Sequence, residues 1–296
     1  MVGVVGGLYF SSSADSRTKK TASEGPSLAF ANSSKPGLRE PLAWPTYGQA
    51  AYGAVDQGAL AVSSSQAQPV PIASLAKTIT ALAVLKKKPL KVGELGPSIT
   101  MTEADVALYN DYLSREGSVA KVEVGQQLSQ YHAMQAVLMM SANNIADSLA
   151  IWAFGSMEAY TEYANSMLGD MDLSHIRVAD ASGFSPQTVG TAEEMVQVAT
   201  EFMRKPVLYE ITTTTGAEIP ITGAIPNYNA HLNTGEFVGV KAGNTDQAGR
   251  CFISASLKNG KVFSVAVVLG ADRISTATID SQSILRDGNS IVEKSR

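Results

Sequence analysis

The sequence predicts an α/β (α+β) fold in which helices cover an antiparallel sheet and an all-helical insertion forms a second lobe. Strand-prone runs lie near both ends of the chain, and the apolar residues between Thr102 and Thr200 mainly follow helical spacing. With 45% apolar and 17% charged residues over 296 positions, the chain can bury one large core. A binding site is therefore expected in the cleft between the two lobes.

Residues 1–43 are expected to precede the folded domain as an apolar remnant and a flexible tether. Met1–Phe10 is apolar but too short to span a membrane, and it lacks the positive charges that precede a signal sequence. It is either the trimmed end of an anchor or signal segment, or a frayed terminus. Residues 11–41 contain few large apolar side chains, so they cannot form a core. The folded domain is therefore predicted at 44–296, with its helical insertion at about 95–205.

The first elements of this domain are a hairpin and a helix. Gln49–Val55 and Ala59–Ser63 are β-prone and flank Asp56-Gln57-Gly58, which predicts a hairpin turn. A helix is predicted to begin at Ser74 and to stop at Pro89, because its apolar residues recur at helical spacing. The lysines just before the proline suit the negative end of a helix.

The last elements are three strands and a closing helix. Phe237–Lys241, Arg250–Leu257 and Val262–Leu269 are strand-like. Asn259-Gly260 lies between the second and third of these runs and is a strong hairpin signal. Ser275–Arg286 has the spacing of a helix that closes the fold.

Composition argues against several classes of function. The net charge of −4 and the scattered lysines and arginines do not predict nucleic-acid binding. Cys251 is the only cysteine, so the chain can form no internal disulfide and no thiolate cluster. His132, His175 and His231 do not have metal-ligand spacing and are expected to be surface or structural residues. No metal or cofactor is expected, and the ligand should be a small molecule or a peptide.

Ser74 and Lys77 form an SxxK motif. Residues three apart in a helix share one face, so the Lys77 amine can reach the Ser74 hydroxyl. Ser16–Lys19 and Ser118–Lys121 have the same spacing, but only Ser74 opens a strongly apolar helix. Lys77 acts as a base only if burial or a second cation lowers its pKa. The alternative is that Ser74 is a helix N-cap and Lys77 a solvated lysine.

Two further motifs carry polar groups suited to peptide chemistry. Ser141-Ala142-Asn143 follows an apolar run, and its hydroxyl can relay a proton while its amide binds a peptide. The alternative is a polar turn between helices. Lys241-Ala242-Gly243 is predicted to end a strand, with the Asn244 N–H beside it. The alternative there is an ordinary strand end.

In this order, SLAK, SAN and KAG resemble the three signatures of the serine penicillin-binding protein and β-lactamase superfamily. Longer stretches resemble its D-alanyl-D-alanine carboxypeptidases: PIASLAKTITA, LMMSANNIADSLA, DASGFSPQTVGTAEEM and GVKAGNTDQAGRCFISAS. The resemblance covers about Trp44 to Leu285. It implies a β-lactamase/transpeptidase-like fold with a five-stranded antiparallel sheet. It also implies extracytoplasmic action on peptidoglycan stem peptides, with β-lactam antibiotics as covalent inhibitors.

The resemblance implies a role for each matched residue. Ser74 attacks the carbonyl of the penultimate D-Ala, Lys77 accepts its proton, and Ser141 passes a proton to the leaving D-Ala. The backbone N–H groups of Ser74 and Asn244 form the oxyanion hole. The implied substrate-binding residues are Asn143, Lys241, Ala242, Gly243, Asn244 and Thr245.

Two departures from the family pattern affect these expectations. Ala242 replaces the usual Thr or Ser, which removes a hydroxyl expected to bind the substrate carboxylate. Thr245, Arg250 and Arg273 are candidates to compensate for that loss. The chain stops at Arg296 without the C-terminal β domain and anchor of many members, so any membrane attachment is expected through the N-terminus.

Four rival functions differ in what they require. A class A β-lactamase needs a glutamate after SxN, and none occurs between Tyr163 and Ala192, so long-lived acylation by penicillin is expected instead. A non-catalytic or weakly active peptidoglycan-binding protein would explain Ala242. A D,D-endopeptidase would use the same catalytic groups. A Ser-His-Asp hydrolase lacks support because no GxSxG motif occurs.

Overall fold

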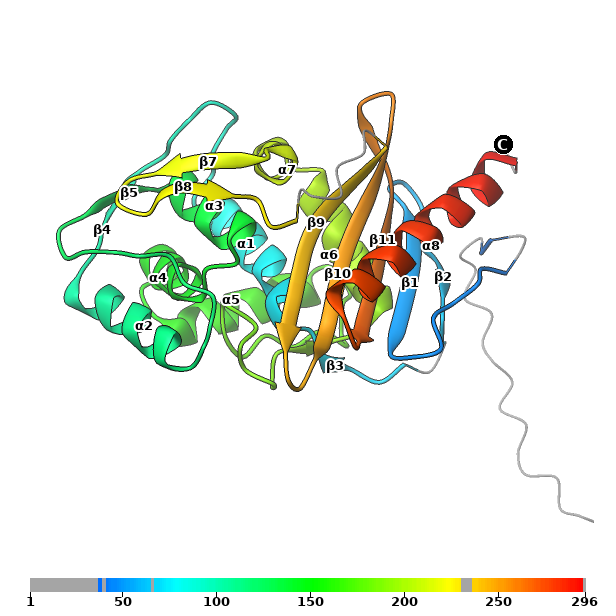
Figure 1. Cartoon of the computed structure of the whole chain (residues 1–296), viewed down its shortest axis with the longest axis horizontal. Helices are drawn as coiled ribbons and strands as arrows, with labels where there is room; N and C mark the ends of the chain where they lie inside the picture. The colour runs from blue at the N-terminus through cyan, green and yellow to red at the C-terminus, as the bar shows by residue number, and fades with distance from the viewer. Residues whose placement is uncertain (1–36, 39–40, 65–66, 230–235, 295–296) are drawn as a thin grey trace, which may run out of the picture. The chain divides into compact units, whose positions relative to one another are not determined.

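The computed structural model describes residues 37–38, 41–64, 67–229 and 236–294. It contains a five-stranded antiparallel sheet in the order β2-β1-β11-β10-β9, which confirms the predicted fold class (Figure 1). The strands are β1 (Gln49–Ala54), β2 (Gly58–Val62), β9 (Phe237–Thr245), β10 (Gly249–Lys258) and β11 (Lys261–Ala271).

Both predicted hairpins form at the predicted turns. β1 and β2 pair from Ala54 opposite Gly58, with Asp56 and Gln57 in the turn, and Gly58 adopts a left-handed φ of +70°. β10 and β11 pair from Lys258 opposite Lys261, with Asn259 and Gly260 at φ of 54° and 72°. Two successive positive φ values are the geometry that Asn-Gly favours, because its twist matches that of the flanking strands.

Helices cover both faces of the sheet. α8 packs against β10 and β11 on one face, and α6 packs against β1 and β11 on the other (Figure 1). The helices are α1 (Ala76–Lys87), α2 (Glu103–Ser114), α3 (Gln130–Met139), α4 (Asn143–Phe154), α5 (Met157–Gly169), α6 (Ala192–Met203), α7 (Pro206–Thr213) and α8 (Ile274–Lys294). The two faces carry separate apolar clusters, so each layer has its own core.

α1 is the central helix of the molecule. Every residue from Ala76 to Val84 is buried, and the helix contacts α3, α4, α5 and α6. A helix that is buried on all sides is stable only inside a protein. The α-helix itself begins at Ala76, two residues after the predicted start at Ser74. A 3-10 turn, η1 (Ala73–Leu75), precedes α1, and Ala73 has a left-handed φ of 47°.

The inserted lobe is mainly helical and also contains short two-stranded ribbons that the sequence analysis did not predict. Each strand is too short to show a two-residue period. The ribbons are β4 (Ser98–Thr100) with β5 (Gln127–Ser129) and, just beyond the predicted insertion, β7 (Gly216–Ile219) with β8 (Gly223–Pro226). A third pair joins β3 (Val70–Pro71), which precedes η1 in the chain, to β6 (Val189–Gly190), which precedes α6.

The closing helix α8 extends eight residues beyond Arg286, from Asp287 to Lys294. Gly288 allows this extension because a Cβ there would lie 2.5 Å from the Tyr52 ring. Next to it, Asn289 Oδ1 accepts a hydrogen bond of 2.9 Å from Tyr52 Oη. Gly and Asn usually end helices, so the packing against β1 overrides the local signal. Within the described residues, no helix is both long and apolar enough to cross a membrane.

Candidate active site

The SxxK motif at Ser74 has the geometry of a nucleophile and its base. Ser74 lies in η1 and Lys77 in the first turn of α1, and Lys77 Nζ donates to Ser74 Oγ at 2.7 Å. Lys77 is completely buried. The match at Ser118 lies in a loop, where the exposed Lys121 pairs with Glu123 instead. The match at Ser16–Lys19 lies outside the described residues.

The Lys77 amine has two more acceptors besides Ser74. Nζ donates to Asn143 Oδ1 and to the Ser182 carbonyl oxygen, each at 2.7 Å. Burial lowers the pKa of Lys77 to about 7, although the carboxylates of Asp180 and Asp147 act in the opposite direction. A lysine with this pKa is substantially uncharged at neutral pH, so it can accept a proton from the Ser74 hydroxyl.

Ser141 lies on a strained turn between α3 and α4. Its φ of 64° is left-handed, which is uncommon for a residue with a side chain. Asn143 then begins α4, and its backbone N–H donates to the Ser118 carbonyl oxygen at 2.8 Å. Gly117 leaves room for the Asn143 amide, because a Cβ there would lie 2.8 Å from Nδ2. The SAN segment is thus held by the loop after α2.

Lys241 reaches Ser141 from the sheet side. Its Nζ donates to Ser141 Oγ at 3.0 Å and to the Ala242 carbonyl oxygen at 2.8 Å. Lys241 pairs with Ile253, but Gly239 pairs with the next residue of β10, so the register shifts at Val240. Such bulges redirect side chains beside active sites. Burial, together with the charge of Lys77, lowers the pKa of Lys241 well below that of an ordinary lysine.

The prediction that the KAG segment ends a strand was wrong, because β9 continues to Thr245. The bulge hides this continuation, since it breaks the alternation of apolar residues. Gly243 is needed where β9 passes η1. A Cβ at that position would lie 3.1 Å from both the Ala73 Cβ and the Ser74 backbone nitrogen. The edge strand therefore lies directly against the turn that carries the hydroxyl.

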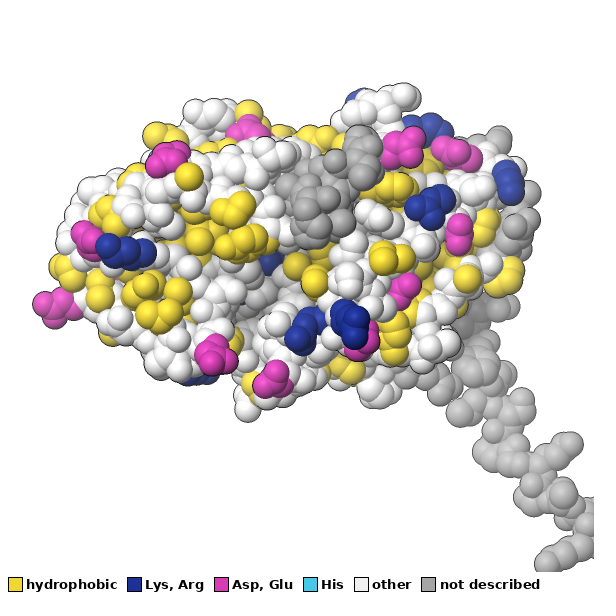
Figure 2. All heavy atoms as spheres, in the orientation of Figure 1, with side chains coloured by type: hydrophobic (Ala, Val, Ile, Leu, Met, Phe, Trp, Pro, Cys, Tyr) yellow, Lys and Arg dark blue, Asp and Glu magenta, His cyan; other side chains and the backbone are white. Residues whose placement is uncertain are grey.

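These residues surround a cavity of about 320 Å³. It lies between the helical lobe and β9, where the face shown in Figure 2 is hollowed. Lys77 is buried behind Ser74. The predicted residues that line the cavity are Ser74, Ser141, Asn143, Lys241, Ala242, Gly243, Asn244 and Thr245. The structure thus brings the predicted site together, and the roles of its members stay predictions.

Comparison with known proteins assigns the chain to a family. The sequence profile of the D-alanyl-D-alanine carboxypeptidases, peptidase S11, matches residues 52–273. The chain belongs to the peptidase S11 family. Two curated relatives are named D-alanyl-D-alanine endopeptidase. The one from Pseudomonas aeruginosa is 27% identical over 208 residues, and the one from Escherichia coli is 25% identical over 207. Each match covers 67% of this chain and 63% of the relative's own length.

Solved structures with the same fold include two DD-peptidases. The Streptomyces K15 DD-transpeptidase has a TM-score of 0.74 and 18% identity, over 84% of this chain and 100% of that one. The D-alanyl-D-alanine carboxypeptidase of Mycobacterium tuberculosis has a TM-score of 0.69 and 21% identity, over 82% and 93%. These likenesses establish the fold of this S11 peptidase.

Where the family pattern has a Thr or Ser hydroxyl, this S11 chain has the methyl group of Ala242. Of the three candidates to compensate for it, Thr245 and Arg250 line the cavity, whereas Arg273 is not among its lining residues. Thr245 Oγ1 already accepts a hydrogen bond of 3.1 Å from the Ala248 N–H. No acidic side chain within the described residues forms an ion pair with Arg250. Arg250 is therefore the better placed of the two for a carboxylate.

Asn229 positions the edge strand of the S11 site, and the sequence analysis did not identify it. Its Oδ1 accepts from the Ala242 N–H at 2.8 Å, and its Nδ2 donates to the Leu138 carbonyl oxygen at 3.0 Å. The amide thus links β9 to α3. Nothing in the neighbouring sequence predicts this role, because both partners are distant in the chain.

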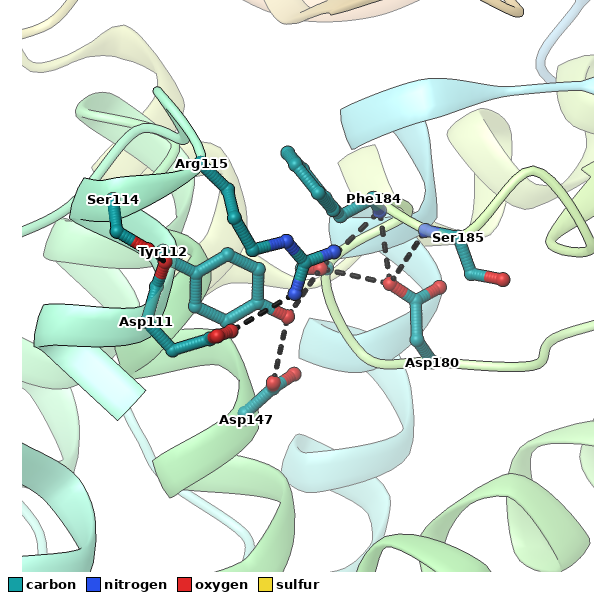
Figure 3. A network of polar contacts seen from close by, with 9 residues as sticks. Asp111, Tyr112, Ser114, Arg115, Asp147, Asp180, Phe184 and Ser185 are labelled. Carbon is teal, nitrogen blue, oxygen red and sulfur yellow. Dashed lines mark hydrogen bonds and ion pairs between the residues drawn. The ribbon is translucent and has the colours of Figure 1, made fainter. Parts of the chain in front are cut away.

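The segment after Asp180 positions the acceptor of Lys77 (Figure 3). Asp180 Oδ2 accepts from Ser182 Oγ at 2.8 Å and from the backbone nitrogens of Phe184 and Ser185 at 2.8 and 3.2 Å. Gly183 is required because a Cβ there would lie 1.8 Å from the Ala73 carbonyl oxygen. The resemblance of DASGF to the family was the sequence signal for this segment, although it gave no roles.

Two of the three histidines lie within the described residues. His175 Nδ1 lies 2.7 Å from Glu194 Oε1, a structural pairing. His132 is partly buried, and His231 lies outside the described residues. Among the residues that the structure describes, no group of three or more His, Cys, Asp or Glu side chains is arranged to hold a metal ion.

Proposed function

We propose that this chain is an extracytoplasmic serine-type D-alanyl-D-alanine carboxypeptidase that removes the terminal D-Ala from peptidoglycan stem pentapeptides. The observation that carries this proposal is the 2.7 Å contact between Ser74 Oγ and the buried amine of Lys77. A buried lysine with a lowered pKa is the base that serine acylation needs, because an exposed lysine remains charged at neutral pH. Membership of the S11 family supports the same reaction.

In the proposed acylation step, Ser74 Oγ attacks the carbonyl carbon of the penultimate D-Ala while its proton moves to Lys77 Nζ. The carbonyl oxygen becomes an oxyanion, which the backbone N–H groups of Ser74 and Asn244 stabilise. Each such donor contributes about 2.7 to 4 kcal/mol in enzymes where it has been removed. The close approach of β9 to η1 at Gly243 supports this assignment.

The leaving group then needs a proton. Ser141 lies beside Lys241 at 3.0 Å, and Asn143 contacts Lys77 at 2.7 Å, so the SAN segment adjoins both amines. We assign Ser141 the relay of the proton that Lys77 took from Ser74 to the amine of the departing D-Ala as the C–N bond breaks. Asn143 holds the peptide, and Lys241 provides positive potential across the cavity. Water then hydrolyses the ester on Ser74.

The terminal carboxylate of the substrate is assigned to Arg250, with Thr245 beside it. On β9 and β10, Arg250 pairs with Asn244 and Phe252 pairs with Ala242, so Arg250 is the diagonal neighbour of Ala242 on one face of the sheet. Long side chains reach diagonal neighbours. A hydrogen bond to a charged group contributes about 1.5 to 3 kcal/mol, which is the part of the binding energy that Arg250 would replace.

Two alternatives have specific support. A D,D-endopeptidase is favoured by the names of both curated relatives and by Ala242, because an endopeptidase substrate need not present a free carboxylate in the same place. A weakly active or non-catalytic peptidoglycan-binding protein is favoured by Ala242 alone. Efficient β-lactam hydrolysis lacks support because no glutamate lies between Tyr163 and Ala192. β-Lactams are therefore expected as long-lived covalent inhibitors.

The proposal extends to where the protein acts. Residues 44–296 are the proposed catalytic domain, with the helical insertion at about 95–205. The expected remnant and tether at 1–43 lie mostly outside the described residues. Action on peptidoglycan requires an extracytoplasmic position, and the N-terminus is the proposed point of membrane attachment. No nucleic acid, metal or cofactor takes part in the proposed reaction.

Product analysis separates the proposed function from its alternatives. The purified protein is incubated with a stem pentapeptide and, separately, with a cross-linked peptide dimer, beside the Ser74→Ala variant. Release of D-Ala from the pentapeptide by the wild type alone is the expected result. Cleavage of only the dimer would establish an endopeptidase, and cleavage of neither would leave peptidoglycan binding as the function.

A further inference from the structure

Asp147 is a buried carboxylate behind the proposed base. It follows Asn143 by four residues on α4, so the two side chains share one face of the helix. Only 7% of Asp147 is exposed. Its Oδ2 accepts a hydrogen bond of 2.7 Å from Tyr112 Oη, whereas its Oδ1 has no hydrogen-bond partner in the described part of the chain (Figure 3).

Asp147 differs from Asp180, the other carboxylate near Lys77. Asp180 accepts hydrogen bonds from two backbone nitrogens and from the hydroxyls of Ser182 and Thr188, so its charge holds the loop in shape. Asp147 accepts a single hydrogen bond from a phenol. A buried carboxylate with so few donors needs another source of stabilisation, because desolvation of its charge is costly.

The charged and titratable groups that act on Asp147 come from four packed elements. They are Lys77 on α1, Tyr112 and Arg115 at the end of α2, Tyr160 on α5, and Asp180. Arg115 is half exposed and is engaged by Asp111 at 2.9 Å. Lys77 is therefore the buried cation of this group. Burial raises the pKa of Asp147 to about 6, while Tyr112 and Lys77 act against that rise.

A hydrogen-bonded path joins Asp147 to the loop that holds Lys77. Tyr112 Oη lies 3.2 Å from Ser182 Oγ and donates to Asp147, and the Ser182 carbonyl oxygen accepts from Lys77 Nζ. The Tyr112 ring also packs edge-on against Phe184, with centroids 5.4 Å apart. Asp147 is thus fixed relative to the amine through two routes, one along α4 and one through Tyr112.

We propose that Asp147 is a positioning residue of the acylation step: its buried carboxylate stabilises the ammonium form of Lys77 and so sets the pH above which Lys77 can take the Ser74 proton. This inference rests on the proposed function. The proton moves from Ser74 Oγ to Lys77 Nζ, and Asp147 itself accepts none. A nearby negative charge favours the product of that transfer but also keeps the resting amine protonated at lower pH.

The test is the rate constant for acylation of Ser74 by a fluorescent penicillin, measured from about pH 5 to about pH 9. For the wild type, the rate is expected to rise with pH through about 7, as Lys77 loses its proton. Asp147→Asn keeps the shape and can still accept from Tyr112. We expect it to shift this rising limb of the pH–rate profile about one pH unit lower, which raises the rate about tenfold at pH values below the limb. The high-pH plateau should fall, because the amine becomes a weaker base.

A second variant and a matched control complete the experiment. Tyr112→Phe removes the donor that favours ionised Asp147, so it should move the limb in the same direction but less far. Glu194→Gln neutralises another carboxylate that is also 7% exposed but pairs with His175, and it should leave the limb unmoved. A limb at the wild-type pH in folded Asp147→Asn, or in Tyr112→Phe if the first variant unfolds, overturns the inference.

Failure of the proposed function would look different. In that case the wild type would form no adduct at any pH, or Ser74→Ala would be acylated equally well. An unmoved limb in the variants with normal wild-type acylation would refute only the role of Asp147.

Discussion

The helical wall and the sheet wall of the cavity differ in how many contacts hold their side chains in place. On the helical side, Lys77 donates three short hydrogen bonds, and a second layer of Tyr112, Ser182 and the two aspartates lies behind it. On the sheet side, Lys241 contacts one hydroxyl and one carbonyl oxygen, and Ala242 offers only a methyl group. The side chains of the helical wall, which holds the nucleophile, are therefore fixed by many hydrogen bonds, whereas those of the sheet wall are fixed by few.

This difference indicates which step of the reaction needs the most precise placement of side chains. Proton transfer between Ser74 and Lys77 depends on placement to within a fraction of an ångström, so it needs support from a second layer. Recognition of a carboxylate can be supplied by one charged side chain from a neighbouring strand. Substitutions of Ser74 or Lys77 should therefore cost far more acylation rate than substitutions on the sheet side.

The largest effect is expected at the base. Lys77→Arg should lower the acylation rate about 10³-fold, because a guanidinium stays charged at every accessible pH and cannot accept a proton. Lys121→Arg is the matched control, since it changes the other described SxxK lysine, which is exposed and pairs with Glu123. Stopped-flow acylation by penicillin measures both. Near-normal rates in folded Lys77→Arg would show that Lys77 is not the base and that the helical wall is no more important for acylation than the sheet wall.

The next effect tests the contact between the walls. Gly243→Ala should lower acylation about tenfold to a hundredfold, because the new Cβ would push β9 away from Ala73 and Ser74. Gly169→Ala is the control, since a Cβ at the end of α5 meets nothing within 4 Å. If Gly243→Ala acylates like the wild type, the close approach of β9 does not serve catalysis.

A smaller effect is expected on the sheet wall. Arg250→Gln should lower kcat/KM about tenfold for a peptide with a free terminal carboxylate, and much less for the corresponding amide. Ala242→Thr should raise kcat/KM for the free carboxylate, and should partly restore it in the double variant. The control is Arg273→Gln, because the Arg273 side chain is 80% exposed and lies outside the cavity lining. Equal losses for acid and amide would contradict the carboxylate role.

The smallest effect on rate is expected away from both walls. Asn289 accepts hydrogen bonds from Tyr52 and Ser264 and donates to Ser256 at 2.9 Å. Asn289→Ala removes these three hydrogen bonds and should lower the free energy of unfolding by about 1 to 3 kcal/mol. Urea denaturation measures this, and the acylation rate of the folded fraction should be unchanged. A large loss of rate would show that the α8 layer shapes the site.

Local patterns in the sequence predicted the parts that local physics determines. The spacing of Ser74 and Lys77 within an apolar helix gave the pair, and Asn259-Gly260 gave the hairpin. The start of the helix and the end of β9 were misplaced. Ala73 and Ser141 take left-handed conformations that their residue types do not favour, and the bulge at Val240 interrupts the strand pattern.

The remaining site residues could not be predicted because their partners are distant in the chain. Asn229 reaches back to Leu138, and Ser182 meets Lys77 across 105 positions. Asp147 sits in an apolar helix where a single carboxylate carries no motif. Such contacts arise only after the helical lobe has packed against α1, so tertiary structure and not local spacing determines them.

Intact-protein mass spectrometry after incubation with benzylpenicillin would show whether Ser74 is the nucleophile. We expect the wild type to gain the mass of one penicilloyl group, peptide mapping to place it on Ser74, and Ser74→Ala to gain none. The adduct should persist long after removal of free penicillin, because no glutamate lies between Tyr163 and Ala192. No adduct on the folded wild type, or an adduct on another residue, would show that Ser74 is not the nucleophile.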